Sequence, residues 1–534
     1  MAGAQDVVVI IGGGHNGLVA AAYLARAGLR VAVLERRPAL GGAAATEEIH
    51  PGFRCPTGAH LCGLLRPEVI RDLELERHGL RFLPFDPAVV ALGESGKALR
   101  LWREERRAQA EIATHSPRDA AAYPRFRAWM VQFAGIVDPL MTRAPPDIAA
   151  PSAGDQLLLL RRAVRIRRLG RDFVHQALRF APMSLRDVLG EWFEGELLQA
   201  SLAIDGLLGT FRGPYSPGTA FGLVHHYLAE VHGGSWTAVH GGMASLTEAL
   251  AAAAWELGVS IRTGAEVERV VISEGRATGV ELVSGERIDA RIVVSSADPK
   301  RTFLRLVDPI ELSADFLGKI RNFNTEGAVA KVNIALRALP RIPALGGDGG
   351  RAPHLRVCPS LEYLERAYDD AKYGKVSSEP MLDVFIPSIL ESGLAPPGGH
   401  VMSVVVQYAP YHLRPGNWDD AREDLGHRTV EILETHMPGL RAAVAAVEVL
   451  TPLDLERRFG LTGGHVYHGE MTLDQQFVLR PVPGWARYRT PIENLYLCGS
   501  GAHPGGGITG APGYTAAREI LRDWKRLGRS GQRR

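Results

Sequence analysis

A glycine-rich turn between two apolar segments near the start of the chain constrains the fold more than any other feature. Residues 6–11 (DVVVII) form a β-branched run that ends at glycines, as strands buried in a parallel sheet do. In the turn GGGHNG, Gly12, Gly14 and Gly17 have the spacing that allows a tight bend and close approach of a pyrophosphate. An alanine-rich helix follows, and a second apolar run over 29–34 completes a βαβ unit. We therefore predict a Rossmann-type dinucleotide site with phosphates at the helix N-terminus.

Glu35 and a second pair of glycines narrow the choice of dinucleotide. Glu35 ends the second strand, about 20 residues beyond the glycines, where a carboxylate accepts hydrogen bonds from ribose hydroxyls and repels a 2′-phosphate. FAD or NAD therefore fits, and NADP does not. Gly41 and Gly42 form another bend close behind the acid, which favours FAD. Within the turn, His15 and Asn16 are further candidate cofactor contacts.

Length and composition bound the rest of the chain. At 534 residues it exceeds the size at which one hydrophobic core stops growing, so we expect two or more regions with separate cores. The 61 basic and 59 acidic residues almost cancel, and no nucleic-acid partner is expected. Four cysteines suit a reducing compartment, and neither an export signal nor an apolar run of about 20 residues is visible. A cytoplasmic location is therefore expected.

Four long strings carry a family resemblance: GGAAATEEIHPGF, LLRPEVIRDLELERHGL, LDQQFVLRPVPG and LYLCGSGAHPGGGITGAPG. They resemble the phytoene-dehydrogenase-like FAD oxidoreductases, in the larger group that contains amine oxidases, protoporphyrinogen oxidase and carotenoid desaturases. Within that group the chain is most similar to the pyridine nucleotide-disulfide oxidoreductase domain-containing protein 2 family. The resemblance spans nearly the whole chain and implies FAD as the cofactor.

One residue departs from the wider group, and one further contact comes from the resemblance. The wider group usually has a basic residue after the double glycine, where this chain has Ala43. We expect charge compensation from Arg36 or from backbone amides instead. The resemblance also implies that the strand near Val267 presents backbone groups to the adenine.

The C-terminal string predicts a strand, a long Gly/Pro loop and a helix that starts near Gly510. We expect Gly499, Ser500, Gly510 and Ala511 to contact the cofactor. A helix N-terminus near the flavin would stabilise the negative charge that develops at N1 and O2 on reduction.

The predicted fold class is α/β: a Rossmann-type FAD-binding domain built from discontinuous segments, interleaved with an α+β substrate domain as in amine oxidases and phytoene desaturases. The first interrupting block is largely helical by periodicity, and the second mixes helices with strands such as VAKVNIAL and VMSVVVQYA. The predicted limits are 1–95, 235–310 and 456–534 for the FAD-binding domain, and 96–234 and 311–455 for the substrate domain.

Cysteines and histidines are the candidates for side-chain chemistry. Cys55 and Cys62 fit neither CxxC nor CxxxxC spacing, so we expect buried structural thiols and no dithiol catalysis. His60 and His503 are the better candidates for a base or a substrate-orienting group, ahead of the other histidines that could face the flavin. These others are His225, His226 and His468. No metal-ligand spacing is present.

The expected function is that of an FAD-dependent dehydrogenase, desaturase or oxidase that removes hydride from a hydrophobic or amine-bearing small molecule, with oxygen or quinone as electron acceptor. Two alternatives stay open, because both resemble the same group: a redox-neutral flavin isomerase, and a lipid-binding escort protein of the GDP-dissociation-inhibitor type. The intact glycines and Glu35 argue against the escort protein.

Residues 157–171 combine five leucines with six arginines. A solvated helix face is the simpler interpretation of this run. As a basic amphipathic helix, it could also make peripheral contact with an anionic membrane.

Overall fold

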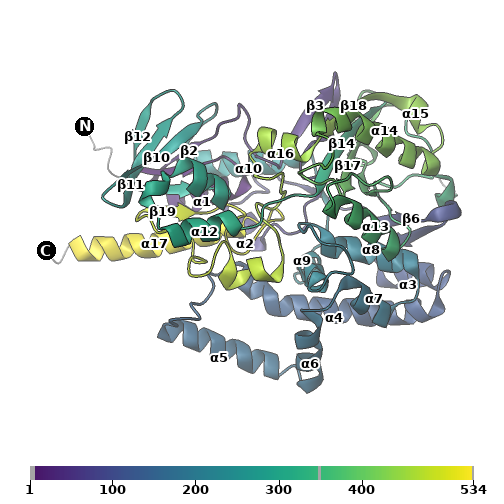
Figure 1. Ribbon diagram of the computed structural model, residues 1–534, viewed down its shortest axis with the longest axis horizontal. Helices are drawn as coiled ribbons and strands as arrows, with labels where there is room; N and C mark the ends of the chain where they lie inside the picture. The colour runs from purple at the N-terminus through teal and green to yellow at the C-terminus, as the bar shows by residue number, and fades with distance from the viewer. Residues whose placement is uncertain (1–6, 347–349, 532–534) are drawn as a thin grey trace.

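A parallel sheet of five strands forms one side of the computed structural model, which describes residues 7–346 and 350–531 (Figure 1). The predicted βαβ unit is confirmed, because β1 (Val7–Ile11) pairs in parallel with β2 (Arg30–Leu34) and α1 (His15–Arg26) connects them. The strand order is β19-β13-β1-β2-β9. The other three strands come from distant segments: β9 (Ser260–Arg262), β13 (Ile292–Ser295) and β19 (Leu495–Leu497).

Two helices from distant segments pack against α1 and complete this core. They are α10 (Met243–Glu256) and α17 (Ala511–Gly531). Small side chains let the helices approach closely, since a Cβ atom at Gly513 of α17 would lie 2.1 Å from the Asn16 carbonyl oxygen of α1. The discontinuous Rossmann-type domain predicted from the sequence is thus confirmed.

A three-stranded antiparallel meander lies beside this sheet (Figure 1). Its strands are β10 (Val267–Ser273), β11 (Arg276–Leu282) and β12 (Arg287–Asp289). Gly275 and Gly285 form its turns with φ angles of 73° and 82°, which glycine adopts at little cost.

The second large sheet has seven strands in the order β18-β14-β17-β16-β15-β6-β7. All its pairings are antiparallel except that of β15 with β6. Every residue of the interior strand β14 is buried. The strands are β6 (Val89–Leu92), β7 (Ala98–Leu101), β14 (Val329–Leu336), β15 (His354–Val357), β16 (Met381–Phe385), β17 (His400–Gln407) and β18 (Val444–Leu450). The two predicted strands, VAKVNIAL and VMSVVVQYA, are β14 and β17.

Helices flank this sheet and form a separate helical region below it (Figure 1). The mainly helical character predicted for the first block is confirmed by α3 (Glu105–Ala113), α4 (Pro117–Met141), α5 (Ala153–Arg167), α6 (Arg171–Phe180), α7 (Leu185–Trp192), α8 (Glu196–Leu207) and α9 (Gly222–Tyr227). An aromatic core that includes Phe126, Phe133 and Phe180 holds most of these helices together. The second block adds α12 (Ala314–Asn322), α13 (Leu361–Lys372), α14 (Trp418–His436), α15 (Leu440–Ala443) and α16 (Pro452–Phe459).

Short elements connect the two sheets. They are the hairpin of β3 (Thr46–His50) and β4 (Phe53–Pro56), the pair of β5 (Phe82–Leu83) and β8 (Ala238–Val239), and the helices α2 (Pro67–Asp72) and α11 (Pro299–Arg301).

Two details differ from the sequence-based expectations. Strand β6 lies within the predicted segment 1–95 but pairs with β15 in the seven-stranded sheet, while the domain limits as a whole stay a prediction. The run 157–171 is not one helix, because α5 ends at Arg167 and α6 begins after Gly170, whose φ angle of 95° breaks the helix. Within the described residues, no helix is long and apolar enough to cross a membrane.

Candidate active site

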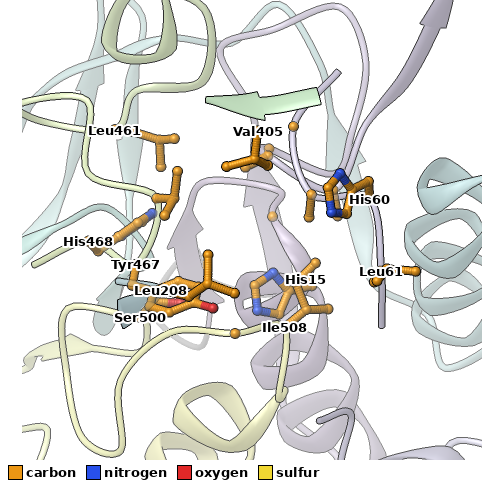
Figure 2. A pocket seen from close by; sticks show the side chains of 18 of the residues that line it. His15, His60, Leu61, Leu208, Val405, Leu461, Tyr467, His468, Ser500 and Ile508 are labelled. Atoms are coloured by element: carbon orange, nitrogen blue, oxygen red, sulfur yellow. The ribbon is translucent and has the colours of Figure 1, made fainter. Parts of the chain in front are cut away.

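One cavity of about 590 Å³ connects the parallel sheet with the seven-stranded sheet. Residues of the glycine-rich turn line one end, and Lys331, His354 and Asp383 of the seven-stranded sheet line the other. Figure 2 shows the region between, with His60 and Leu61 on one side and Tyr467 and His468 on the other. The cavity is therefore long enough to bring both sheets to one ligand site.

Backbone geometry shapes the first end of the cavity. Gly12 has a φ angle of 96°, which a side chain would strain. A Cβ atom at Gly17 would lie 2.1 Å from the Gly12 carbonyl oxygen, whereas a Cβ atom at Gly14 would meet nothing within 4 Å. The first and third glycines are thus required by packing, and α1 begins directly behind them with its N-terminus toward the cavity.

Glu35 stands at the end of β2, where two backbone amides hold its carboxylate. Gly13 N donates to Oε2 at 2.7 Å and Arg37 N donates to Oε1 at 2.9 Å. Glu35 is 6% exposed and lines the cavity together with Ala265, Glu266 and Val267. This is the arrangement expected for a carboxylate that accepts hydrogen bonds from a ribose.

The structure brings most of the predicted cofactor contacts to this cavity. Those that line it are Gly12, Gly14, His15, Asn16, Glu35, Arg36, Gly42, Ala43, Val267 and Ser500. Those that do not line it are Gly17, Gly499, Gly510 and Ala511. At Gly499 a Cβ atom would lie 2.2 Å from the Ser296 carbonyl oxygen, so this glycine serves close packing behind the wall. Asn16 Nδ2 donates to Ser500 Oγ at 3.0 Å and ties the first and last segments together.

Two arginines at the cavity could supply the positive charge that the wider group has at the position of Ala43. Arg36 lines the cavity, its Nη2 donates to the Arg457 and Arg458 carbonyl oxygens at 2.9 and 3.1 Å, and burial lowers the pKa of its guanidinium. Arg301 also lines the cavity, and its buried Nε has no hydrogen-bond partner among the described residues. Sequence analysis missed Arg301, although its position just after β13 at the edge of the parallel sheet is a usable signal.

His503 is not placed in the cavity, which makes it a poor catalytic candidate. Its buried ring lies against α4, with Nε2 at 2.9 Å from the Leu140 carbonyl oxygen, and burial lowers its pKa to about 4. His225 lies behind the Gly/Pro loop, with Nε2 at 3.1 Å from the Gly506 carbonyl oxygen. His60, His226 and His468, in contrast, line the cavity.

A buried pair, His60 and Lys331, marks the start of the second end of the cavity. Lys331 Nζ lies 3.2 Å from His60 Nδ1 and donates to Ser403 Oγ at 2.6 Å. Burial lowers the pKa of Lys331 to about 8. Burial and the neighbouring Lys331 also hold the pKa of His60 well below its usual value, so this imidazole is neutral. The pair can therefore gain or release a proton near neutral pH.

A chain of buried charges continues from this pair. Asp383 Oδ2 lies 3.9 Å from His60 Nε2, and Asp383 Oδ1 lies 2.6 Å from His354 Nε2. His354 Nδ1 lies 2.9 Å from the Ala88 carbonyl oxygen, so both of its ring nitrogens face oxygen atoms. Burial alone would raise the pKa of Asp383, but His354 and Arg356 hold it far below the usual range.

Arg356 extends the charge chain to the helical region. Its Nη2 donates to Asp205 Oδ1 at 2.5 Å, and Asp205 in turn lies 3.1 Å from His226 Nδ1. Sequence analysis missed Lys331, Asp383, Arg356 and Asp205. A usable signal was the single lysine within the apolar strand VAKVNIAL, since a charge in a buried strand needs a partner.

The cysteines form no redox pair. Cys55, Cys62, Cys358 and Cys498 are all free and buried. Burial raises the pKa of both Cys55 and Cys62 to about 12, which suppresses the reactive thiolate.

The comparisons with known proteins agree with this geometry. Residues 17–521 match the family of flavin containing amine oxidoreductases, and the chain belongs to this family. It is 41% identical to the rat protein named pyridine nucleotide-disulfide oxidoreductase domain-containing protein 2, over 97% of this chain and 94% of the relative. It is 30% identical to a component of the limonene dehydrogenase of Castellaniella defragrans, over 97% and 95% of the two chains. Phytoene desaturases are more distant relatives, at 26% identity.

Solved structures show the same fold. Cyclohexylamine oxidase from Brevibacterium oxydans superposes with a TM-score of 0.59 at 16% identity, and covers 97% of this chain and 99% of its own. A putrescine oxidase variant superposes with a TM-score of 0.61 at 17% identity, over 98% and 99% of the two chains.

The cofactor of this enzyme family is FAD, and the residues of this chain fit it. Asn16 Oδ1 and His15 Nε2 are buried at the cavity without a hydrogen-bond partner among the described residues, as is Arg301 Nε. Buried polar groups rarely stay unpaired in native proteins. The phosphates and hydroxyls of a dinucleotide would supply the missing partners, so the chain is an FAD-dependent oxidoreductase.

Proposed function

We propose that the chain is an FAD-dependent dehydrogenase that removes hydride from a C–H bond of a small, largely apolar molecule. The observation that carries this proposal is the single cavity that runs from Gly12 and Glu35 to the buried pair of His60 and Lys331. FAD, when bound, supplies a hydride acceptor at N5. The protein then has to orient the substrate, exclude water and manage one proton.

The His60–Lys331 pair is our candidate for the proton. Lys331 has a lowered pKa, and its ammonium is held by His60 Nδ1 and Ser403 Oγ, so it is oriented rather than mobile. An Nζ that is partly neutral near pH 8 can accept a proton from a substrate hydroxyl, amine or carbon acid and release it afterwards. His60 would act by holding Lys331 and by facing the substrate.

Apolar and aromatic side chains line the substrate part of the cavity. They include Leu208, Val329, Val405, Tyr123, Tyr227 and Trp236. Such walls suit a hydrophobic molecule or the carbon skeleton of an amine, and the names of the limonene and phytoene relatives agree with a hydrocarbon-like substrate. We propose oxygen or a quinone as the electron acceptor.

Flavin reduction tests the proposal directly. The purified protein should show the absorption bands of oxidised flavin, which candidate substrates should bleach under anaerobic conditions. His60→Asn and Lys331→Met should slow bleaching by about 10²–10⁴-fold while FAD stays bound. Protein that is colourless and cannot be reconstituted with FAD would overturn the proposal, and turnover without any electron acceptor would instead identify a redox-neutral isomerase.

We also propose that this protein acts in the cytosol and touches an anionic membrane through α5. This helix protrudes below the body of the molecule (Figure 1), and Asp155 is its only buried residue. Leu157, Leu160 and Val164 are 47%, 61% and 41% exposed beside the arginines, so the apolar face has no partner within the described chain.

Vesicle flotation tests the membrane contact. Wild-type protein should float with vesicles that contain phosphatidylserine, and a Leu157→Ser/Leu160→Ser variant should not. Ile310→Ser is the matched control, because Ile310 is 85% exposed and lies outside α5. Equal flotation of the double variant and the control would rule out this contact.

A further inference from the structure

Arg480 is a buried cation that the proposed chemistry does not use. Its side chain is 0% exposed, and all of its hydrogen bonds go to backbone carbonyl oxygens. Nε donates to Ser500 at 3.1 Å, Nη1 to Glu470 and Gln475 at 3.0 and 3.2 Å, and Nη2 to Ser500, Tyr467 and Gly469 at 2.8, 3.0 and 3.2 Å.

The charge of Arg480 has no counter-ion. Other buried arginines are paired, Arg356 with Asp205 at 2.5 Å and Arg66 with Asp138 at 2.7 Å. Among the described residues no carboxylate lies within ion-pair distance of Arg480, and burial alone lowers the pKa of its guanidinium to about 9. A buried, unpaired charge is expensive, and carbonyl dipoles offset only part of that cost. Such a residue invites a functional explanation.

Arg480 lies directly behind the wall of the cavity. Two of its acceptors, Tyr467 and Ser500, line the cavity and appear together in Figure 2. Its Nε would lie 3.6 Å from a Cβ atom at Gly505, in the loop whose residues Gly507 and Ile508 also line the cavity. The positive charge is therefore separated from the cavity by one layer of backbone.

Neighbouring titratable groups do not cancel this charge. Burial and the nearby Arg480 lower the pKa of His465 to about 3, so its ring is neutral. Burial also lowers the pKa of His468. The Glu470 carboxylate is engaged elsewhere, with Arg212 Nε at 3.4 Å and the Phe211 amide at 3.0 Å.

We propose that Arg480 sets the reduction potential of the bound flavin by placing an uncompensated positive charge behind the loop that holds it. This inference rests on the proposed function. Arg480 is a positioning residue, because its charge acts through the backbone of Tyr467 and Ser500 without touching the substrate. A fixed positive charge favours the form of the flavin that carries more negative charge, and so favours reduction.

The test compares the potential of the holoenzyme with those of two substituted forms. Arg480→Lys keeps a charge and Arg480→Met removes it, while both lose most of the carbonyl hydrogen bonds. For Arg480→Met we expect the reduction equilibrium to shift about tenfold or more toward the oxidised form, which is about 30 mV for a two-electron couple. The dissociation constant for sulfite, an anionic probe that adds to oxidised flavin, should rise by a similar factor.

Two controls separate charge from structure. Arg428→Met removes an arginine that also donates to a backbone carbonyl, that of Ser377. Because Ser377 does not line the cavity, this substitution should leave the potential unchanged. In Arg480→Lys the reduction potential should be near that of the wild type at about pH 6. At about pH 8.5 it should lie below that of the wild type, because a buried lysine loses its proton at lower pH than Arg480 does.

Each outcome decides the inference. If the reduction potential shifts equally in Arg480→Lys and Arg480→Met at low pH, or shifts in neither, the role of Arg480 is only structural, as a donor to backbone carbonyl groups. If Arg480→Met does not bind FAD, the pH dependence of the reduction potential of Arg480→Lys is the deciding measurement. If that potential changes with pH as steeply as the potential of the wild type does, the inference is overturned. Wild-type protein without FAD would instead overturn the proposed function.

Discussion

The backbone shapes one end of the cavity, and charged side chains shape the other. At the glycine-rich end, shape comes from the backbone: Gly12 and Gly17 are close-packed, and Glu35 is fixed by two amides. At the far end, shape comes from charged side chains on neighbouring strands, with Asp383 between His354 and Arg356. A backbone site depends on residues close in sequence, whereas a charge cluster depends on the register of strands that are far apart.

The sharpest test of the backbone end is a pair of alanine substitutions. Gly17→Ala would place a Cβ atom 2.1 Å from the Gly12 carbonyl oxygen, so we expect it to abolish FAD binding. Gly14→Ala should leave the fold intact, because its φ angle is −73° and its Cβ atom would meet no protein atom within 4 Å, but it should weaken FAD binding, because Gly14 lines the cavity where the pyrophosphate approaches the backbone. Urea unfolding of the two variants without FAD distinguishes them, since only Gly17→Ala should lose stability. Equal stability of the two variants would contradict the packing argument.

At the charged end, we expect the largest loss of stability from Asp383→Asn. This substitution removes the carboxylate that lies 2.6 Å from His354 and 3.7 Å from the buried Arg356, and breaking a buried pair costs about 3–5 kcal/mol. Urea unfolding provides the measurement. Asp289→Asn, which removes an exposed partner of Arg287, should change stability by less than about 0.5 kcal/mol. Similar losses for the two variants would show that the cluster contributes nothing special.

The pH dependence of stability tests Lys331. Its pKa is about 8 in the folded chain against an ordinary value of 10.5, so between these values the unfolded chain binds more protons than the folded one. Stability should therefore rise with pH from about 8 to about 10.5, by up to about 3 kcal/mol from this group. The difference in unfolding free energy between wild type and Lys331→Met, followed over this range, should show that rise. A pH-independent difference would refute the assignment.

The smallest effect is expected from Cys55→Ser, in strand β4 outside the cavity lining. Cys55 Sγ is buried at 3.7 Å from Asn333 Oδ1, and its high pKa keeps it a thiol. Bound FAD and the rate of flavin reduction should stay within about twofold of the wild type, with a stability loss of about 1 kcal/mol. A reduction rate that collapses while FAD stays bound would point back to dithiol chemistry.

Local patterns predict the first end of the site well. The strand, turn and helix around Gly12 lie within 20 residues, so spacing alone indicates the geometry. His503 stays a weak candidate, because a loop position does not reveal which way a ring points, and here the ring points to α4. The predicted helix over 157–171 is too long, because Gly170 carries a break that apolar periodicity conceals.

The far end could not be predicted by the same means. Lys331, Arg356 and Asp383 lie on β14, β15 and β16, and their meeting depends on a sheet order that adjacent sequence does not determine. Only Lys331, a lysine within an apolar strand, indicated that a charge cluster was present. When a charged residue lies in a predicted buried strand, candidate partners of opposite charge should therefore be sought in the other predicted strands before the fold is known.

The order of strands in the parallel sheet has a consequence for how the protein is made. β19 pairs with β13 and is the last strand among the described residues, and Ser500, which accepts a hydrogen bond from Asn16 of α1, follows just behind it. During synthesis the edge of β13 stays open until Leu497 has left the ribosome, so the cofactor site closes only after β19 has been made. A chain that stops before Leu495 would thus present an unpaired edge to its neighbours, a hazard for aggregation and not merely a shorter enzyme.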